Sequence, residues 1–190
     1  MQDSLAEHFL ANTVLEFRGL HTLVQKAVAQ VDDATFFRTL DPESNSIAVV
    51  MKHLGGNMRS RWSDFLTSDG EKPDRDRDAE FVVATWETRH EIEQHAQEGW
   101  QILFETLAGL GPEHLQTKVR IRDERHTVVQ AIQRQLTHYG YHVGQIVLLA
   151  KHGRTGDWHT LSIPRGGTTA FNARMREWYG DSGPAAAPQR

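Results

Sequence analysis

Two histidines on one predicted helix have a spacing that suits chemistry. His138 and His142 stand four positions apart in a stretch whose apolar residues recur at helical intervals. Residues four apart on a helix lie on the same face, with Cβ atoms about 5–6 Å apart. Imidazole is a common protein ligand for zinc, nickel, copper and iron. The pair can therefore supply two ligands to one ion if a neighbouring element supplies a third.

His53 is the candidate for that third ligand. It lies at the margin of the apolar stripe of another predicted helix, in line with Asn57, so it can face the protein interior. Three neutral imidazoles leave the other coordination positions to water or substrate, which is the pattern of an open catalytic site. In a chain with 11 histidines such a pair also arises by chance, usually on the surface. The spacing alone leaves both readings open.

Three polar residues share the helix faces of these histidines. Asn57 and Arg61 follow His53 at four-residue intervals, and Gln145 lies three positions after His142. At these intervals their side chains can point toward a metal cavity and orient a ligand or substrate. Ordinary hydrogen bonds between helices are the alternative for each.

Composition excludes several classes of protein. The absence of cysteine rules out disulfides, thiolate metal sites and cysteine nucleophiles. A formal net charge of -4 offers no basic excess for nucleic acid. No apolar run approaches the roughly 18 residues that a membrane helix needs. Because the start, MQDSLAEHFL, lacks the pattern of a secretory signal, we expect a soluble cytoplasmic protein.

The elements that must position the histidines follow from apolar periodicity. Helices are predicted at about residues 5–31, 46–67, 79–107 and 128–153. The candidate capping residues are Ser44, Asn45 and Ser46 before the second helix and Asp123 and Thr127 before the fourth. The third helix is anchored partly by Val82 and Trp86. Residues 68–78 read as a solvated, charge-alternating loop, 115–122 as a short extended piece and 169–178 as a short helix. We expect one domain over residues 1–180 and a disordered tail over 181–190.

Three segments resemble a known superfamily. They are residues 45–73 (NSIAVVMKHLGGNMRSRWSDFLTSDGEKP), 138–142 (HYGYH) and 161–166 (LSIPRG). Together they resemble the DinB/YfiT-like superfamily, and more closely a subgroup without an assigned function, over nearly the whole chain to about Asn172. The resemblance implies an all-α fold, an antiparallel four-helix bundle with a C-terminal extension. It also implies that His53, His138 and His142 bind nickel, zinc or iron, and that the protein is a homodimer.

The resemblance implies a site more strongly than a reaction. Some relatives transfer thiol groups, some use low-molecular-weight thiols in isomerisation, and others resemble metal-dependent hydrolases. We therefore expect a metal-dependent hydrolase or thiol transferase that acts on a small molecule, which can be a thiol. The alternative is a catalytically silent dimeric bundle, structural or stress-related, whose histidines only hold helices together.

Overall fold

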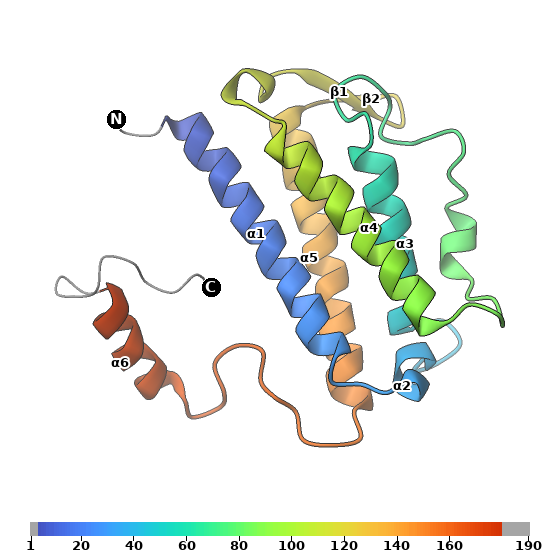
Figure 1. Ribbon diagram of the computed structural model, residues 1–190, viewed down its shortest axis with the longest axis vertical. Coiled ribbons are helices and arrows are strands. Elements are labelled where there is room, and N and C mark those ends of the chain that lie inside the picture. The colour runs from blue at the N-terminus through green and yellow to red at the C-terminus, as the bar shows by residue number, and fades with distance from the viewer. Residues whose placement is uncertain (1–3, 180–190) are drawn as a thin grey trace. The chain divides into compact units, whose positions relative to one another are not determined.

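The computed structural model describes residues 4–179. This part of the chain is predominantly helical, with one small two-stranded sheet (Figure 1). It divides into two compact units between Thr155 and Gly156. Within the described residues, no helix is both long and apolar enough to cross a bilayer.

Four long helices make up most of the first unit. They are α1 (Leu5–Val28), α3 (Ile47–Trp62), α4 (Arg89–Ala108) and α5 (Val128–Gly153). Each begins after a serine or threonine whose hydroxyl accepts a hydrogen bond from a free backbone N–H of the first turn. These caps are Ser4, Ser46, Thr88 and Thr127. All four predicted helices are therefore present. Of the candidate caps, Ser46 and Thr127 are confirmed, while Ser44, Asn45 and Asp123 do not cap these helices.

The long helices run in two directions. α1 and α5 run one way, while α3 and α4 run the other (Figure 1). α3 contacts both α4 and α5, and α1 contacts α5 and α4. Consecutive helices therefore do not alternate throughout, as a strictly antiparallel arrangement requires. The physical reason is the connection over residues 63–88, which returns along the side of the helices before α4 begins (Figure 1).

The predicted third helix begins about ten residues too early, because residues 79–88 do not continue into it. A 3-10 turn, η1 (Asp78–Phe81), is followed by extended chain, and α4 starts only at Arg89. Val82 and Trp86, predicted as anchors, are 62% and 74% exposed. Thr88 and Glu91 form a capping box that sets the true start. The predicted second helix is also too long at its C-terminal end: it was expected to reach residue 67, but α3 ends at Trp62.

An aromatic cluster forms the centre of the first unit. Phe17 of α1 contacts Trp62 of α3 and Tyr139 of α5, and Tyr139 also contacts Trp100 of α4. The buried Tyr139 hydroxyl accepts a hydrogen bond from Trp62 and donates one to Asn57. Tyr139 is therefore a packing residue, and it places the neighbouring His138 and His142 at the edge of the core.

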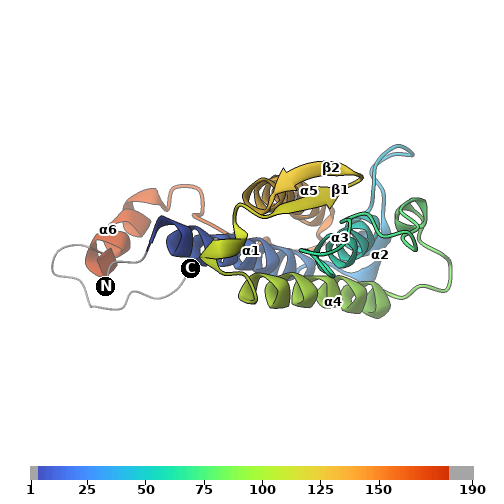
Figure 2. The same ribbon diagram turned by 90° about the horizontal axis from the view of Figure 1, so that it is seen from above.

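A short hairpin lies at the start of α5 (Figure 2). Strands β1 (Lys118–Ile121) and β2 (Glu124–Thr127) pair antiparallel, so the predicted extended piece is confirmed and its partner strand was missed. Both turn residues, Arg122 and Asp123, have positive φ, as the favoured two-residue turns require. The Asp69 carboxylate accepts hydrogen bonds from both of their backbone N–H groups. This contact holds an otherwise strained turn.

The charged segment 68–78 is only in part the solvated loop that its sequence predicts. Asp69 and Gly70 are bound to the hairpin, and Glu71 and Arg75 join an ion-pair network around Arg61. The side chains of Arg61 and Arg75 are almost fully buried. Part of the segment's charge therefore pairs inside the protein, whereas Asp74, Asp76, Arg77 and Asp78 face water as predicted.

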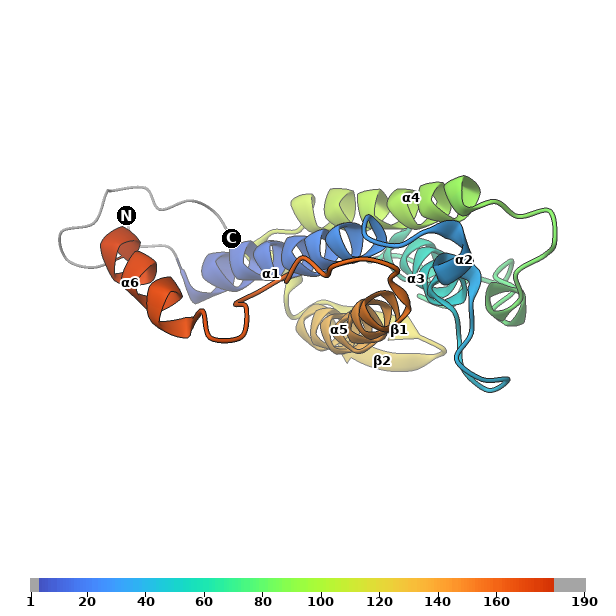
Figure 3. The same ribbon diagram turned by 90° about the horizontal axis from the view of Figure 1, so that it is seen from below.

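Two smaller elements complete the first unit, and one helix forms the second. α2 (Asp33–Phe37) contacts the start of α3 (Figure 3), and η2 (Pro112–His114) precedes the hairpin. In the second unit α6 (Thr168–Tyr179) confirms the predicted short helix. The predicted single domain over 1–180 stays a prediction, and the predicted tail 181–190 lies outside the described residues.

Candidate metal centre

Three histidine side chains from two helices converge at one point. His53 comes from α3, and His138 and His142 come from α5. The Nε2 atom of His138 lies 3.3 Å from that of His53 and 3.1 Å from that of His142. One ligand atom from each ring lies within 4.8 Å of the other two. His53 and His142 are buried and His138 is half-buried, so the group forms part of the protein interior.

These distances match the spacing of nitrogens around a single ion. Two nitrogens at about 2.0–2.1 Å from a tetrahedral zinc ion lie about 3.3 Å apart. Three imidazoles at this spacing therefore lie close enough to hold a metal ion. The donor set is borderline in softness and suits zinc, nickel, copper or iron.

A buried carboxylate fixes the ring of His53. Glu80 Oε2 lies 2.8 Å from His53 Nδ1, and Arg75 donates to both carboxylate oxygens of Glu80. Burial raises the pKa of Glu80, but the hydrogen bonds from His53 and Arg75 outweigh it and hold the pKa below its usual value. Because the ionised carboxylate can only accept, His53 Nδ1 carries the proton. His53 Nε2 therefore presents a lone pair to the centre of the group.

An amide does the same for His142. Gln145 Oε1 lies 2.8 Å from His142 Nδ1, and the Gln145 amide nitrogen donates to the Tyr141 hydroxyl. Since a carbonyl oxygen only accepts, His142 Nδ1 donates and its Nε2 is free to bind. Outer partners of this kind orient metal-binding histidines and raise their basicity. Gln145 therefore orients a candidate metal ligand, which is the first of the two roles that its spacing suggested.

Burial keeps the free imidazole nitrogens unprotonated. Burial, with smaller repulsion from His142, His53 and two arginines, lowers the pKa of His138 to about 3. Burial also lowers the pKa of His142, against the opposing Gln145 hydrogen bond. At neutral pH both rings are therefore neutral, which is the form that binds metals.

Gly56 makes room for the carboxylate. A Cβ added at Gly56 would collide with the Oε1 and Cδ atoms of Glu80, because the side chain of Glu80 lies directly over the helix backbone there. Its neighbour Gly55 lies against His95 and Gly99 of α4, where a side chain would also collide. The two glycines inside α3 are thus explained by close approach on both sides.

The three histidines open onto a pocket of about 450 Å³. Asn57, Arg61 and Gln145 line it, as their spacing suggested. Two further histidines, His90 and His95 of α4, do not line it. Pockets of this size hold small molecules. The arrangement can thus bring a ligand of a few atoms to the tips of the imidazole rings.

Two residues of the centre were missed by sequence reasoning. Glu80 had been assigned to the third helix and Arg75 to a solvated loop. Neither position carries a periodic signal, because both belong to the irregular connection 63–88. The capping box at Thr88 and Glu91 was the available signal: it shortens the third helix and leaves Glu80 free to turn toward α3.

Comparison with known proteins identifies the family. Residues 4–167 match the family described as "Protein of unknown function (DUF1572)", and the chain belongs to it. No curated protein and no solved structure matches the chain.

Proposed function

We propose that this member of the DUF1572 family binds one divalent cation, zinc, nickel or iron, through His53, His138 and His142, and is a metal-dependent enzyme acting on a small molecule. The observation that carries the proposal is the convergence of three imidazole Nε2 atoms. Two of these rings have their opposite nitrogens held by Glu80 and Gln145. A histidine group that served only to join helices would not need its lone pairs aimed at one point.

The pocket beside the histidines favours catalysis over a purely structural site. A structural zinc site is closed by four protein ligands, whereas a catalytic one keeps a position open. Here three ligands face a pocket, and no fourth His, Asp or Glu joins the group within the described residues. A bound divalent ion supplies Lewis-acid chemistry, polarising a substrate oxygen or lowering the pKa of a water or thiol. Hydrolysis or thiol transfer is therefore the proposed reaction class.

We also propose that the first unit is a DinB/YfiT-like four-helix bundle. Support comes from the packing of α1, α3, α4 and α5 and from the placement of the histidines, one on α3 and a four-residue pair on α5. The same packing accommodates the rival function, a silent bundle in which the histidines pin α3 to α5. Substrate turnover by the metal-loaded protein separates the two functions.

Elemental analysis of the untagged protein tests the proposal. The wild type should carry close to one equivalent of zinc, nickel or iron, and a variant with His53, His138 and His142 changed to alanine should carry none while staying folded. A variant with the exposed His152 changed to alanine controls for loss of a histidine. A wild type that takes up none of these metals after incubation would overturn the proposal. Metal binding without turnover of hydrolysis or thiol-transfer substrates would favour the silent bundle.

A further inference from the structure

The wall of the pocket beside the histidines is rich in arginine. Five arginines line it, and among the described residues no aspartate or glutamate does: Arg61, Arg75, Arg77, Arg122 and Arg134. The planar guanidinium group matches the geometry of carboxylates and phosphates, and it is favoured where such anions are recognised. Clusters of arginine also form for structural reasons, when nearby acids neutralise them.

The acids near this wall are too few to neutralise it. Glu71 Oε2 accepts hydrogen bonds from three arginines: Arg61 at 2.9 Å, Arg122 at 3.1 Å and Arg75 at 3.3 Å. A second carboxylate, the buried Glu80, is bound by Arg75. Three guanidinium groups thus share two carboxylates in these ion pairs, so one of the three has no carboxylate of its own.

The two remaining arginines add to this excess. Arg134 lies 3.6 Å from Glu124, and Arg77 lies 3.8 Å from Asp78. Both acids are largely exposed to water, and exposed ion pairs at these distances are weak. Both guanidinium groups are therefore available to an anion that enters the pocket.

Two buried polar atoms on the same wall have no partner. Arg61 is 5% exposed and its Nε atom donates to nothing, while Gln135 is 3% exposed and its Oε1 atom accepts nothing. Buried polar groups are almost always hydrogen-bonded, so an unpaired one calls for an explanation. A bound molecule with an oxyanion for Arg61 and a hydroxyl or amine donor for Gln135 would satisfy both.

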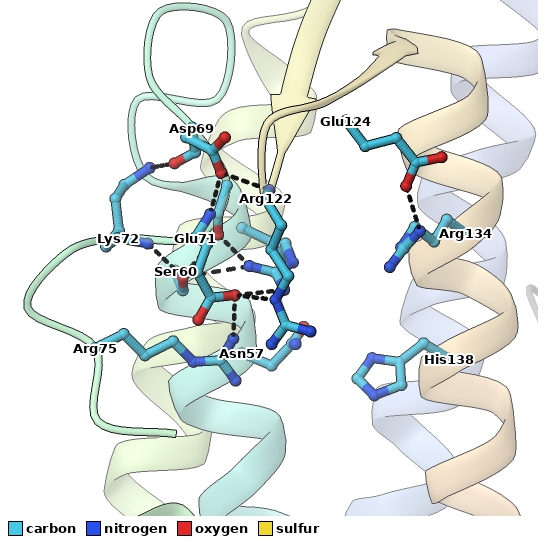
Figure 4. Close-up of polar contacts among 12 residues, drawn as sticks. Asn57, Ser60, Asp69, Glu71, Lys72, Arg75, Arg122, Glu124, Arg134 and His138 are labelled. Carbon is cyan, nitrogen blue, oxygen red and sulfur yellow. Dashed lines mark hydrogen bonds and ion pairs between the residues drawn. The ribbon is translucent and has the colours of Figure 1, made fainter. Parts of the chain in front are cut away.

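Arg61, Arg122 and Arg134 lie toward the end of the pocket nearest the hairpin. Arg134 precedes His138 by one turn of α5, and Arg61 follows His53 by about two turns of α3, which runs in the opposite direction. Figure 4 shows Arg134 and His138 on α5 facing Arg122 and Asn57 across the site. One helical turn is about 5.4 Å, so these arginines lie about 5–11 Å along the helices from the histidines.

We propose that the substrate of this site carries an oxyanion, a carboxylate or a phosphate, that Arg61, Arg122 and Arg134 bind while its reacting group lies at the histidines. The inference rests on the proposed function for the role of the histidine end. Arg61 is fixed by Glu71 and by the carbonyl of Gly70. Arg122 is fixed at its backbone, through the Asp69 carboxylate that holds its turn. Arg61 is therefore in place before a ligand arrives, and the backbone that carries Arg122 is held beside it.

Calorimetric titration of metal-free protein tests the inference without interference from anions that bind a metal directly. The probes are inorganic phosphate, succinate and, as a neutral match for succinate, succinamide. We expect phosphate, succinate or both to bind and succinamide not to bind. R122Q and R134Q should each weaken binding about 10-fold or more. R120Q, which changes an exposed arginine of the same hairpin outside the pocket, should leave it unchanged.

Each outcome gives a decision. Binding of phosphate alone or succinate alone supports the inference and names the anion. The inference would be overturned if neither anion bound, if succinamide bound as tightly as succinate, or if R122Q and R134Q both kept the wild-type affinity for the anion. Metal content measured on parallel samples separates the two proposals. Metal without anion binding refutes this inference alone, and arginine-dependent anion binding without any metal refutes the proposed enzyme while leaving an anion-binding pocket.

Discussion

Changing Glu80 to glutamine tests how a buried carboxylate tunes the metal centre. Glutamine has nearly the same size, so it fits the space over Gly56, and its carbonyl can still accept from His53 Nδ1. The negative charge is lost, and His53 becomes a less basic ligand. Loss of an outer-shell partner lowers metal affinity by about 10–100-fold, which corresponds to about 1.4–2.7 kcal/mol. The side chain of Glu80 is 8% exposed, so little water is present to weaken the effect of the lost charge on His53.

The same substitution also has a structural effect that must be measured separately. Arg75 is buried and loses its doubly bonded partner, keeping only Glu71 at 3.3 Å. Breaking a buried ion pair typically costs about 3–5 kcal/mol, and the remaining partner should place the loss near the lower end. The metal-free variant should therefore unfold at lower denaturant concentration.

Competition with a chromophoric zinc chelator measures the affinity, and circular dichroism under the same conditions verifies folding. The matched control is E87Q, which removes the carboxylate of the Lys52–Glu87 pair without touching a histidine. E87Q should keep the wild-type zinc affinity. If folded E80Q bound zinc within twofold of the wild type, Glu80 would have no influence on His53, and the reasoning from the hydrogen bond at 2.8 Å would be refuted.

Three further substitutions give distinct results. G56A should displace the carboxylate of Glu80 and weaken zinc binding about 10-fold in the chelator assay. The control G19A, at a helix position with open space, should keep the wild-type zinc affinity. Equal zinc affinities of G56A and G19A would contradict the packing argument. Y139F leaves the buried partners Trp62 and Asn57 without a hydrogen bond to the Tyr139 hydroxyl, so the free energy of unfolding should fall by about 1–3 kcal/mol. Urea titration measures this change, and an unchanged midpoint would contradict the prediction. Burial lowers the pKa of His21 below its ordinary value of 6.5, so the unfolded chain binds the proton more readily below that pH and stability falls as pH falls. H21Q should therefore show a smaller loss of stability between pH 7 and pH 5, and an identical loss would argue against burial of a neutral ring.

The sequence by itself determined the helices and the three candidate ligands. Apolar residues repeat with the helical period, and caps such as Ser46 and Thr127 mark the starts, so these elements depend on neighbours within one or two turns. The pair His138 and His142 belongs to the same class of information, since helix geometry alone puts them on one face. The place of His53 on its apolar stripe made it a candidate, and the family resemblance supported its pairing with His138 and His142, because no local rule relates α3 to α5.

Tertiary structure decided what surrounds the ligands. Glu80 lies 27 positions from His53 and reaches it only because the irregular connection 63–88 folds back along α3. Such a connection has no period, and its charges read as solvated until partners from elsewhere bury them. The same return path makes α4 parallel to α3. The fit of Gly56 under Glu80 and the arginine wall likewise arise from contacts between distant segments, which short-range sequence patterns do not encode.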